Sequence, residues 1–125
     1  MNDQFGSPTF SEDIANFTIT IIKNLISNID DIKYKKNIYH FTTDGTTNWY
    51  EYAKFIISCA DKYEFKKKIK RANIFPVTSD QYKTMALRPK NSKLDNSLVK
   101  KTFNLNMKHW KHSVEKVVKE LKDQL

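Results

Sequence analysis

Apolar residues recur at helical spacing near the start of the chain and predict a helix from about Ser11 to Asn28. Thr9 and Glu12 stand three residues apart, as the two partners of a capping box do, and mark where this helix starts. The apolar positions that define it are Ile14, Phe17, Ile21, Ile22, Leu25, Ile26 and Ile29. The polar stretch that follows, from Asn28 to Lys36, is predicted to be a loop.

A second helix is predicted from about Trp49 to Cys59. Asn48 offers an N-cap oxygen, and Glu51 follows three residues later. One face of this helix is apolar and consists of Trp49, Tyr52, Ala53, Ile56, Ile57 and Ala60. The charged stretch from Asp61 to Ala72 fits either an extension of the helix or a solvated connector.

Two more helices are predicted towards the end of the chain. Asp95 or Asn96 can cap a short helix that continues through Phe103. A longer helix runs from about Met107 to Lys122. The side chains that it should bury are Trp110, Val114, Val117, Val118 and Leu121.

Two short strands are predicted between these helices. Asn37 to Thr43 is rich in β-branched and aromatic residues and ends at the turn signal Asp44-Gly45. Asn73 to Val77 contains a proline, which confines it to a sheet edge or a strand end. The segment from Lys83 to Ser92 has no periodicity and is expected to be a loop that other parts of the molecule must hold.

Four helices and two short strands predict a mixed α/β fold in which residues 1–125 form a single partial domain. A chain of this length has no room for a complete two-domain enzyme. Two isolated strands are too few for a stable sheet, since three or more are normally needed. We therefore expect the chain to be part of something larger.

Composition narrows the class of protein. Hydrophobic residues make up 39% of the chain and aromatic residues 13%, so intrinsic disorder is not expected. No apolar run is long enough for a membrane span and no signal peptide is recognisable, so we expect a soluble, cytoplasmic protein without membrane contact. The net charge of +8 invites a nucleic-acid partner. However, only Arg71 and Arg88 are arginines, the residue on which base readout depends, so nucleic-acid binding is not expected.

The sequence offers no residues for several kinds of cofactor site. Its two glycines, Gly6 and Gly45, are too few for a dinucleotide-binding turn or a Walker phosphate loop. Cys59 is the single cysteine, which excludes an internal disulfide and a cysteine zinc cage. His109 and His112 lie three residues apart on a predicted helix, but with no third ligand in view no metal site is predicted.

Four ordered blocks of the sequence resemble one enzyme family. The blocks are DQFGSPTF at Asp3 to Phe10, IYHFTTDGTTNWYEYAK at Ile38 to Lys54, FPVTSDQY at Phe75 to Tyr82, and ALRPKNSKLDNS at Ala86 to Ser97. In this order they resemble successive blocks of the dTDP-4-dehydrorhamnose reductases, which are extended short-chain dehydrogenase/reductases. The late Trp110, followed by a short amphipathic helix, is similar to how those enzymes end. The resemblance is to the C-terminal, substrate-binding half of the family.

The resemblance implies a place in dTDP-L-rhamnose biosynthesis, where these enzymes reduce a 4-keto sugar nucleotide with NADPH. It also implies that the NADPH-binding Rossmann half and the catalytic Tyr-x-x-x-Lys pair precede the first block. We therefore expect a truncated or split reductase that binds a dTDP-sugar, holds no cofactor of its own and supplies no catalytic residue. Activity, if any, would require pairing with a separately encoded N-terminal half.

Two Tyr-x-x-x-Lys pairs do occur in the chain, Tyr50 with Lys54 and Tyr63 with Lys67. This spacing puts a phenol and an ammonium group on one helix face, where the lysine can lower the pKa of the phenol. By the resemblance, however, Trp49 to Lys54 belongs to a packing helix after the active site. Neither pair is predicted to be catalytic.

Arg88 is the leading candidate for contact with a sugar nucleotide. Its planar guanidinium suits two oxygens of a diphosphate, and it lies in the loop beside Pro89. Composition alone leaves open that it pairs with a carboxylate such as Asp95. The resemblance favours the diphosphate, because arginine in this loop of related enzymes commonly faces it, with Asn91 or Ser92 supporting the loop.

Gln4, Ser7 and Thr9 form a second candidate group, since amide and hydroxyl groups beside a helix N-terminus can hydrogen-bond sugar hydroxyls or a phosphate. The same residues also fit a plain turn and helix cap. His40 is expected to be a packed histidine rather than a base or ligand. Two rival functions remain open: a non-catalytic regulatory or interaction module on the same fold, and a decaying gene product that never folds stably.

Overall fold

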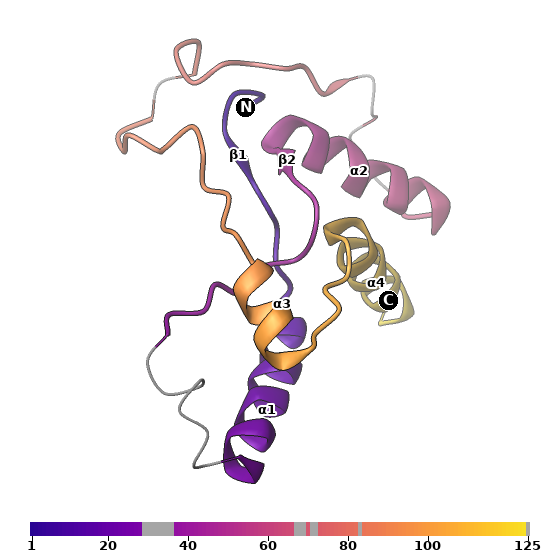
Figure 1. The fold of residues 1–125 in the computed structure, drawn as a ribbon. Helices are drawn as coiled ribbons and strands as arrows, with labels where there is room; N and C mark the ends of the chain where they lie inside the picture. The colour runs from indigo at the N-terminus through magenta and orange to yellow at the C-terminus, as the bar shows by residue number, and fades with distance from the viewer. Residues whose placement is uncertain (29–36, 67–69, 71–72, 83, 125) are drawn as a thin grey trace.

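The computed structural model describes residues 1–28, 37–66, 70, 73–82 and 84–124. Within this part the chain forms four helices and one two-stranded sheet, as expected for a mixed α/β fold (Figure 1). In chain order the elements are β1 (Phe5–Gly6), α1 (Ser11–Ser27), β2 (Thr47–Asn48), α2 (Trp49–Lys62), α3 (Ser97–Phe103) and α4 (Trp110–Asp123). Among the described helices, not one is both long and apolar enough to span a bilayer.

The predicted positions of the strands are wrong. β1 and β2 pair antiparallel, with Phe5 opposite Asn48 and Gly6 opposite Thr47. Residues 37–43 stay outside this sheet because their aromatic side chains pack on α1 and α3 instead. Residues 73–77 are not a strand either: Pro76 has no N–H to donate, and the Val77 carbonyl accepts a hydrogen bond from the Asn2 N–H at 2.9 Å.

The predicted start of α1 is right, but its capping box is wrong. The N-cap residue is Phe10, which makes no side-chain cap hydrogen bond. The Thr9 hydroxyl lies 3.1 Å from the Ser7 carbonyl oxygen and 3.1 Å from the Thr42 hydroxyl. Thr9 therefore ties the helix entry to a distant segment rather than capping the helix.

The other helix starts follow local chemistry more closely. The Asn48 side chain accepts the Glu51 N–H at 2.9 Å, so its predicted cap on α2 is confirmed, although α2 continues to Lys62. At α3, the Asp95 carboxylate accepts the Ser97 N–H at 2.8 Å. The last helix begins at Trp110, three residues later than predicted. Two predicted segments lie partly outside the described residues. Residues 29–36 belong to the predicted loop from Asn28 to Lys36, and residues 67–69, 71 and 72 belong to the charged stretch from Asp61 to Ala72.

Two small hydrophobic clusters take the place of one large core. The first lies between α2 and α4 and is built from Cys59, Trp110, Val114 and Val118, with Tyr52, Phe55, Ile56, Tyr63 and Phe65 packed around them. The second lies between α1, α3 and residues 37–43 and is built from Val99, Phe103 and Met107, with Phe17, Ile21, Tyr39, Phe41 and Leu105 around them. Figure 1 shows the two helix pairs as separate arms of the molecule.

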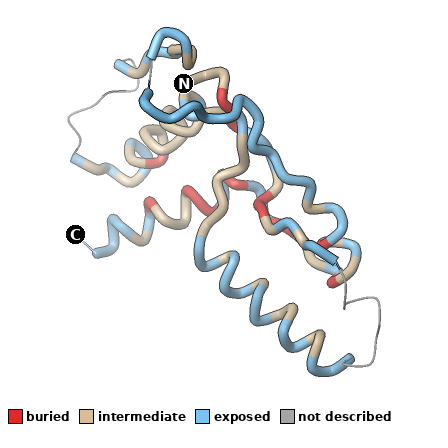
Figure 2. Tube along the Cα trace, turned by 90° about the vertical axis from the view of Figure 1, so that its left-hand side faces the viewer, coloured by how far each residue is buried: buried red, intermediate tan, exposed pale blue. Residues whose placement is uncertain are grey.

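Several apolar side chains predicted to pack are exposed. Leu121 on α4 is 51% exposed, and Trp49 on α2 is 56% exposed. No residue of α1 is fully buried, as the absence of red along this helix shows (Figure 2). Ile14, Ile22 and Ile26 are exposed. Helical spacing locates such residues on one face, but it does not show whether a neighbouring element covers that face.

Asp44 joins the two clusters. Its backbone accepts the Trp110 N–H at 3.0 Å and donates to the Lys108 carbonyl at 3.0 Å, which fixes the start of α4. Its carboxylate accepts from the Asn96 amide at 2.9 Å and from the Lys100 ammonium at 2.9 Å, which fixes α3. These hydrogen bonds hold the pKa of the Asp44 carboxyl below its usual range, and the bond from Asn96 contributes most.

Gly45 completes the turn after Asp44. Its φ of +85° lies in the left-handed region that favours glycine. A Cβ atom at this position would also overlap the imidazole of His109. The turn signal in the sequence is therefore a steric requirement as well as a conformational one.

Asp44→Asn should lower the free energy of unfolding at pH 7 by about 1 kcal/mol, the scale of a partly exposed, charge-assisted hydrogen bond. Because the native carboxyl has the lower pKa, its contribution is present above the unfolded pKa of about 3.9 and is lost as pH falls through the native pKa. Urea unfolding at pH 7 and at pH 3 measures both effects. The difference between the two proteins should be smaller at pH 3 than at pH 7, and an equal difference at both pH values would contradict the assignment.

Gly45→Ala should destabilise the fold by about 1–3 kcal/mol, because alanine is strained at positive φ and its methyl meets His109. Adding His109→Ser removes the overlap and keeps a side-chain oxygen at the N-cap of α4. The double variant should therefore be more stable than Gly45→Ala with the imidazole in place. If the second change brings no recovery in a thermal melt, the steric part of the explanation is wrong.

Candidate functional site

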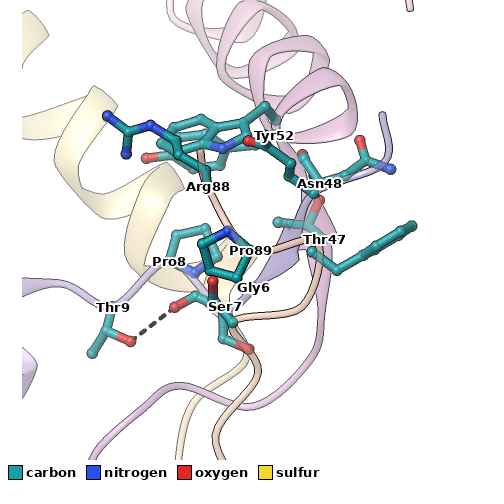
Figure 3. Close-up of a pocket in the computed structure, with 13 residues that line it drawn as sticks. Gly6, Ser7, Pro8, Thr9, Thr47, Asn48, Tyr52, Arg88 and Pro89 are labelled. Carbon is teal, nitrogen blue, oxygen red and sulfur yellow. Dashed lines mark hydrogen bonds between the residues drawn. The ribbon is translucent and has the colours of Figure 1, made fainter. Parts of the chain in front are cut away.

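Three segments far apart in sequence line a pocket of about 460 Å³ (Figure 3). The first segment contributes residues 4–9, the second Thr47, Asn48, Trp49 and Tyr52, and the third Arg88, Pro89 and Ser92. Drug-sized ligands occupy pockets of roughly 300–1,000 Å³, so the space suits a small molecule. The pocket therefore lies where three segments that are at least 35 residues apart in sequence meet.

The backbone of Phe5 holds these segments together. On one side Phe5 pairs with Asn48 across the sheet. On the other side its N–H donates to the Lys90 carbonyl at 2.9 Å, and its carbonyl accepts the Ser92 N–H at 2.8 Å. The loop of residues 84–92 therefore runs beside β1 and adds a parallel bridge at Asn91.

One part of the pocket wall is aromatic. Trp49 and Tyr52, on the first turn of α2, have ring centroids 6.1 Å apart in an edge-on arrangement. Tyr52 in turn packs edge-on against the buried Trp110, with centroids 5.9 Å apart. The core thus fixes Tyr52, while the more exposed Trp49 presents a ring surface on which a planar base or a sugar can stack.

The other part of the wall is polar. Gln4 is 8% exposed, and the Ser7 hydroxyl donates to the Gly45 carbonyl at 2.6 Å. The Thr9 hydroxyl lies 3.1 Å from the Ser7 carbonyl oxygen. A serine hydroxyl that donates to the protein keeps its lone pairs free to accept, so Ser7 is suited to accept a hydrogen bond from a ligand hydroxyl.

Arg88 lines the pocket together with Pro89 (Figure 3). Its side chain is exposed, and no ion pair joins it to Asp95 within the part of the chain that the structure describes. Asp95 instead accepts the Ser97 N–H. The guanidinium is therefore available to an anionic ligand.

The structure brings five of the six predicted binding residues to this pocket: Gln4, Ser7, Thr9, Arg88 and Ser92. Asn91, the sixth, lies outside the lining. Its side chain accepts the Lys93 N–H at 3.1 Å, and its backbone bridges to Phe5, so it shapes the loop that carries Arg88. Whether these residues bind a ligand remains a prediction.

Sequence reasoning missed Trp49, Tyr52, Thr47 and Asn48 as pocket residues. The two aromatic residues share a helix face with core positions, so their spacing predicts packing rather than a binding surface. Thr47 and Asn48 were hidden because β2 was not predicted. One signal in the sequence could have found them: they follow shortly after the predicted Asp44-Gly45 turn. This turn brings the start of α2 to the N-terminal segment.

Other candidate residues lie apart from this chemistry. The Lys54 ammonium lies 4.7 Å from the centre of the Tyr50 ring and donates to Glu51 at 3.1 Å, so it is held by a carboxylate rather than left free to assist the phenol. Lys67, the partner in the second Tyr-x-x-x-Lys pair, is not among the described residues. His40 is exposed and lies outside the sheet. In the described part of the chain, no three potential ligands gather as a metal site requires.

The sequence matches a family model described as the RmlD substrate binding domain over residues 1–123. It is 33% identical to a dTDP-4-dehydrorhamnose reductase of Escherichia coli K12, across 97% of this chain and 38% of that enzyme. It is 32% identical to the reductase of Aggregatibacter actinomycetemcomitans, across 92% of this chain and 37% of that enzyme. The chain thus spans well under half the length of these curated relatives.

Solved structures show the same likeness. A dTDP-4-dehydrorhamnose reductase of Bacillus anthracis, solved in complex with NADP, matches with a TM-score of 0.68 and 29% identity. That match covers 92% of this chain and 35% of the enzyme. A dTDP-4-dehydrorhamnose reductase of Clostridium acetobutylicum shares the fold, with a TM-score of 0.67 over 98% of this chain and 38% of that one.

Proposed function

Because the chain belongs to the RmlD substrate-binding domain family and corresponds to the C-terminal, substrate-binding part of the reductases, we propose that its pocket binds a dTDP-linked sugar of dTDP-L-rhamnose biosynthesis. One observation carries the proposal. Arg88, an aromatic wall and a set of hydroxyl and amide groups line a single pocket, although they come from three distant segments.

Each part of a sugar nucleotide has a suitable neighbour in this pocket. The two phosphates carry negative charge, which the planar guanidinium of Arg88 can pair with in a bidentate manner. The base or the sugar ring can stack on Trp49 and Tyr52. Gln4, Ser7 and Thr9 supply polar atoms for sugar hydroxyls. We assign these roles as parts of the same proposal.

Reduction of a 4-keto sugar also requires a hydride donor. The Bacillus anthracis relative was solved with NADP, whereas these 125 residues contain two glycines and no dinucleotide-binding turn. We propose that NADPH is supplied by a dinucleotide-binding half, whether that half is separately encoded or continuous with these residues. The chain's own residues would then bind and orient the sugar nucleotide.

The exposed loop residues support such a partner. Phe75 is 72% exposed, Tyr82 62%, and Met85 and Leu87 are fully exposed. These side chains lie on the same loop region that brings Arg88 to the pocket. A dinucleotide-binding half docked there would cover them and close the pocket. The alternative of a regulatory module is not favoured, because the relatives with the highest identity reported above are named as reductases.

Arg88→Ala should weaken the binding of dTDP-L-rhamnose by about tenfold, the lower range for a hydrogen bond to a charged group, because Arg88 is exposed. Isothermal titration calorimetry on the full chain measures the affinity, and quenching of tryptophan fluorescence reports occupancy. Lys93→Ala removes a nearby exposed charge outside the pocket lining and is the matched control.

The same titration with thymidine, which has no phosphate, separates the roles of the pocket wall. Arg88→Ala should leave thymidine binding unchanged while it weakens the binding of dTDP-L-rhamnose. Equal affinity of both proteins for dTDP-L-rhamnose would show that Arg88 does not contact the diphosphate. Failure of the unaltered chain to bind dTDP-L-rhamnose at all would overturn the proposed function.

A further inference from the structure

Asp3 contacts two separate parts of the loop that carries Arg88. We refer to residues 77–82 and 84–92 as the strap. The Asp3 carboxylate accepts the Ser79 N–H at 3.0 Å and the Ser79 hydroxyl at 2.5 Å. The Lys90 ammonium lies 3.8 Å from the same carboxylate. One side chain thus contacts the first and the last part of the strap.

The part of the strap between these contacts has little packing of its own. Met85 and Leu87 are fully exposed, and Arg88 is exposed as well. The hydrogen bond of the Thr84 hydroxyl is local, to the Ala86 carbonyl at 2.8 Å. Exposed backbone with few buried contacts opens readily, so the position of Arg88 depends on how the strap is anchored.

Phe5 anchors one end of the strap only. Its backbone pairs with Lys90 and Ser92, which follow Arg88. The earlier part is held by the Asp3 contacts to Ser79 and by the Asn2 N–H, which donates to the Val77 carbonyl at 2.9 Å. Of these anchors, Asp3 supplies the charged side chain, and its own side chain is 20% exposed.

Asp3 is also coupled to the pocket through the backbone. Asp3 immediately precedes Gln4, which lines the pocket and is 8% exposed. The hydrogen bonds from Ser79 hold the pKa of the Asp3 carboxyl below its usual range, so the group is charged at neutral pH. Asp3, Gln4 and Phe5 therefore form one short segment in which Asp3 holds the strap and the next two residues line the pocket.

We propose that Asp3 is a positioning residue for sugar-nucleotide binding, which fastens the two ends of the strap so that Arg88 is held at the pocket. The proposal rests on the proposed function, since Arg88 is taken to contact the diphosphate. Asp3 itself lies outside the pocket lining and acts through Arg88.

Asp3→Asn in the full chain tests this role, because the amide keeps the shape of the side chain but loses the charge and one acceptor oxygen. Affinity for dTDP-L-rhamnose, measured by calorimetry at pH 7, should fall about fivefold to tenfold, the scale of a charge-assisted hydrogen bond that is partly retained. Asp80→Asn changes the same charge on an exposed residue of the strap and should leave affinity unchanged. Ser79→Ala, which removes the hydroxyl donor, should lower affinity less than Asp3→Asn does.

A double-mutant cycle distinguishes positioning from general loss of stability. If Asp3 acts through Arg88, Asp3→Asn should have little further effect in the Arg88→Ala background. Amide hydrogen exchange adds a readout that needs no ligand. In Asp3→Asn, exchange should speed up at Ser79, whose N–H donates to Asp3, and at Ser92, whose N–H donates to the Phe5 carbonyl, while the amides of α2 and α4 stay protected.

The outcomes separate this inference from the proposed function. If the unaltered chain fails to bind dTDP-L-rhamnose, the proposed function falls and the positioning role falls with it. If the unaltered chain binds and Asp3→Asn binds equally well, only the positioning role is overturned. A loss of affinity that is the same with and without Arg88, or faster exchange throughout α2 and α4, would show that Asp3 is merely structural and would also overturn it.

Discussion

The pairing of Phe5 with two distant segments is the constraint on which the candidate site depends. Its backbone joins β2 on one side and the Lys90 to Ser92 loop on the other. A pocket built from three segments exists only if something holds them in register, and among the described residues neither hydrophobic cluster includes a member of this loop. The site is therefore assembled by a few backbone hydrogen bonds rather than by a core, which explains why anchors such as Asp3 matter for Arg88.

The rest of the fold is also held together by a small number of contacts. Two small clusters are connected through Asp44, whose backbone fixes the start of α4 and whose carboxylate fixes α3. Apolar side chains remain exposed on α1 and along the strap, for example Ile22 and Leu87. In the family's full-length members this part makes up well under half of the chain. A substrate-binding part that works beside a second half has less need to bury all of its apolar surface against itself.

Local signals predicted the helices, whereas long-range pairing decided the strands. The Asn48 cap and the helical spacing after it were readable because their partners lie within four residues. β1 and β2 are two residues each, and Phe5 finds Asn48 through the fold rather than through any periodicity. The segment 37–43 has strand composition, but packing of Phe41 on Phe17 overrides it. Arg88 was identified by phosphate chemistry and family resemblance, while Trp49 was hidden among apparent core positions.

Nuclear magnetic resonance can test whether the three segments form one sugar-nucleotide site. The full chain, labelled with 15N, would be titrated with dTDP-L-rhamnose, and the shifts of each amide, the Trp49 indole and the Arg88 guanidinium would be followed. A single site predicts saturable shifts at residues 4–9, 47–52 and 88–92, with α1 beyond its first turn unaffected. Saturable shifts that cluster elsewhere, or an absence of saturable shifts, would contradict it.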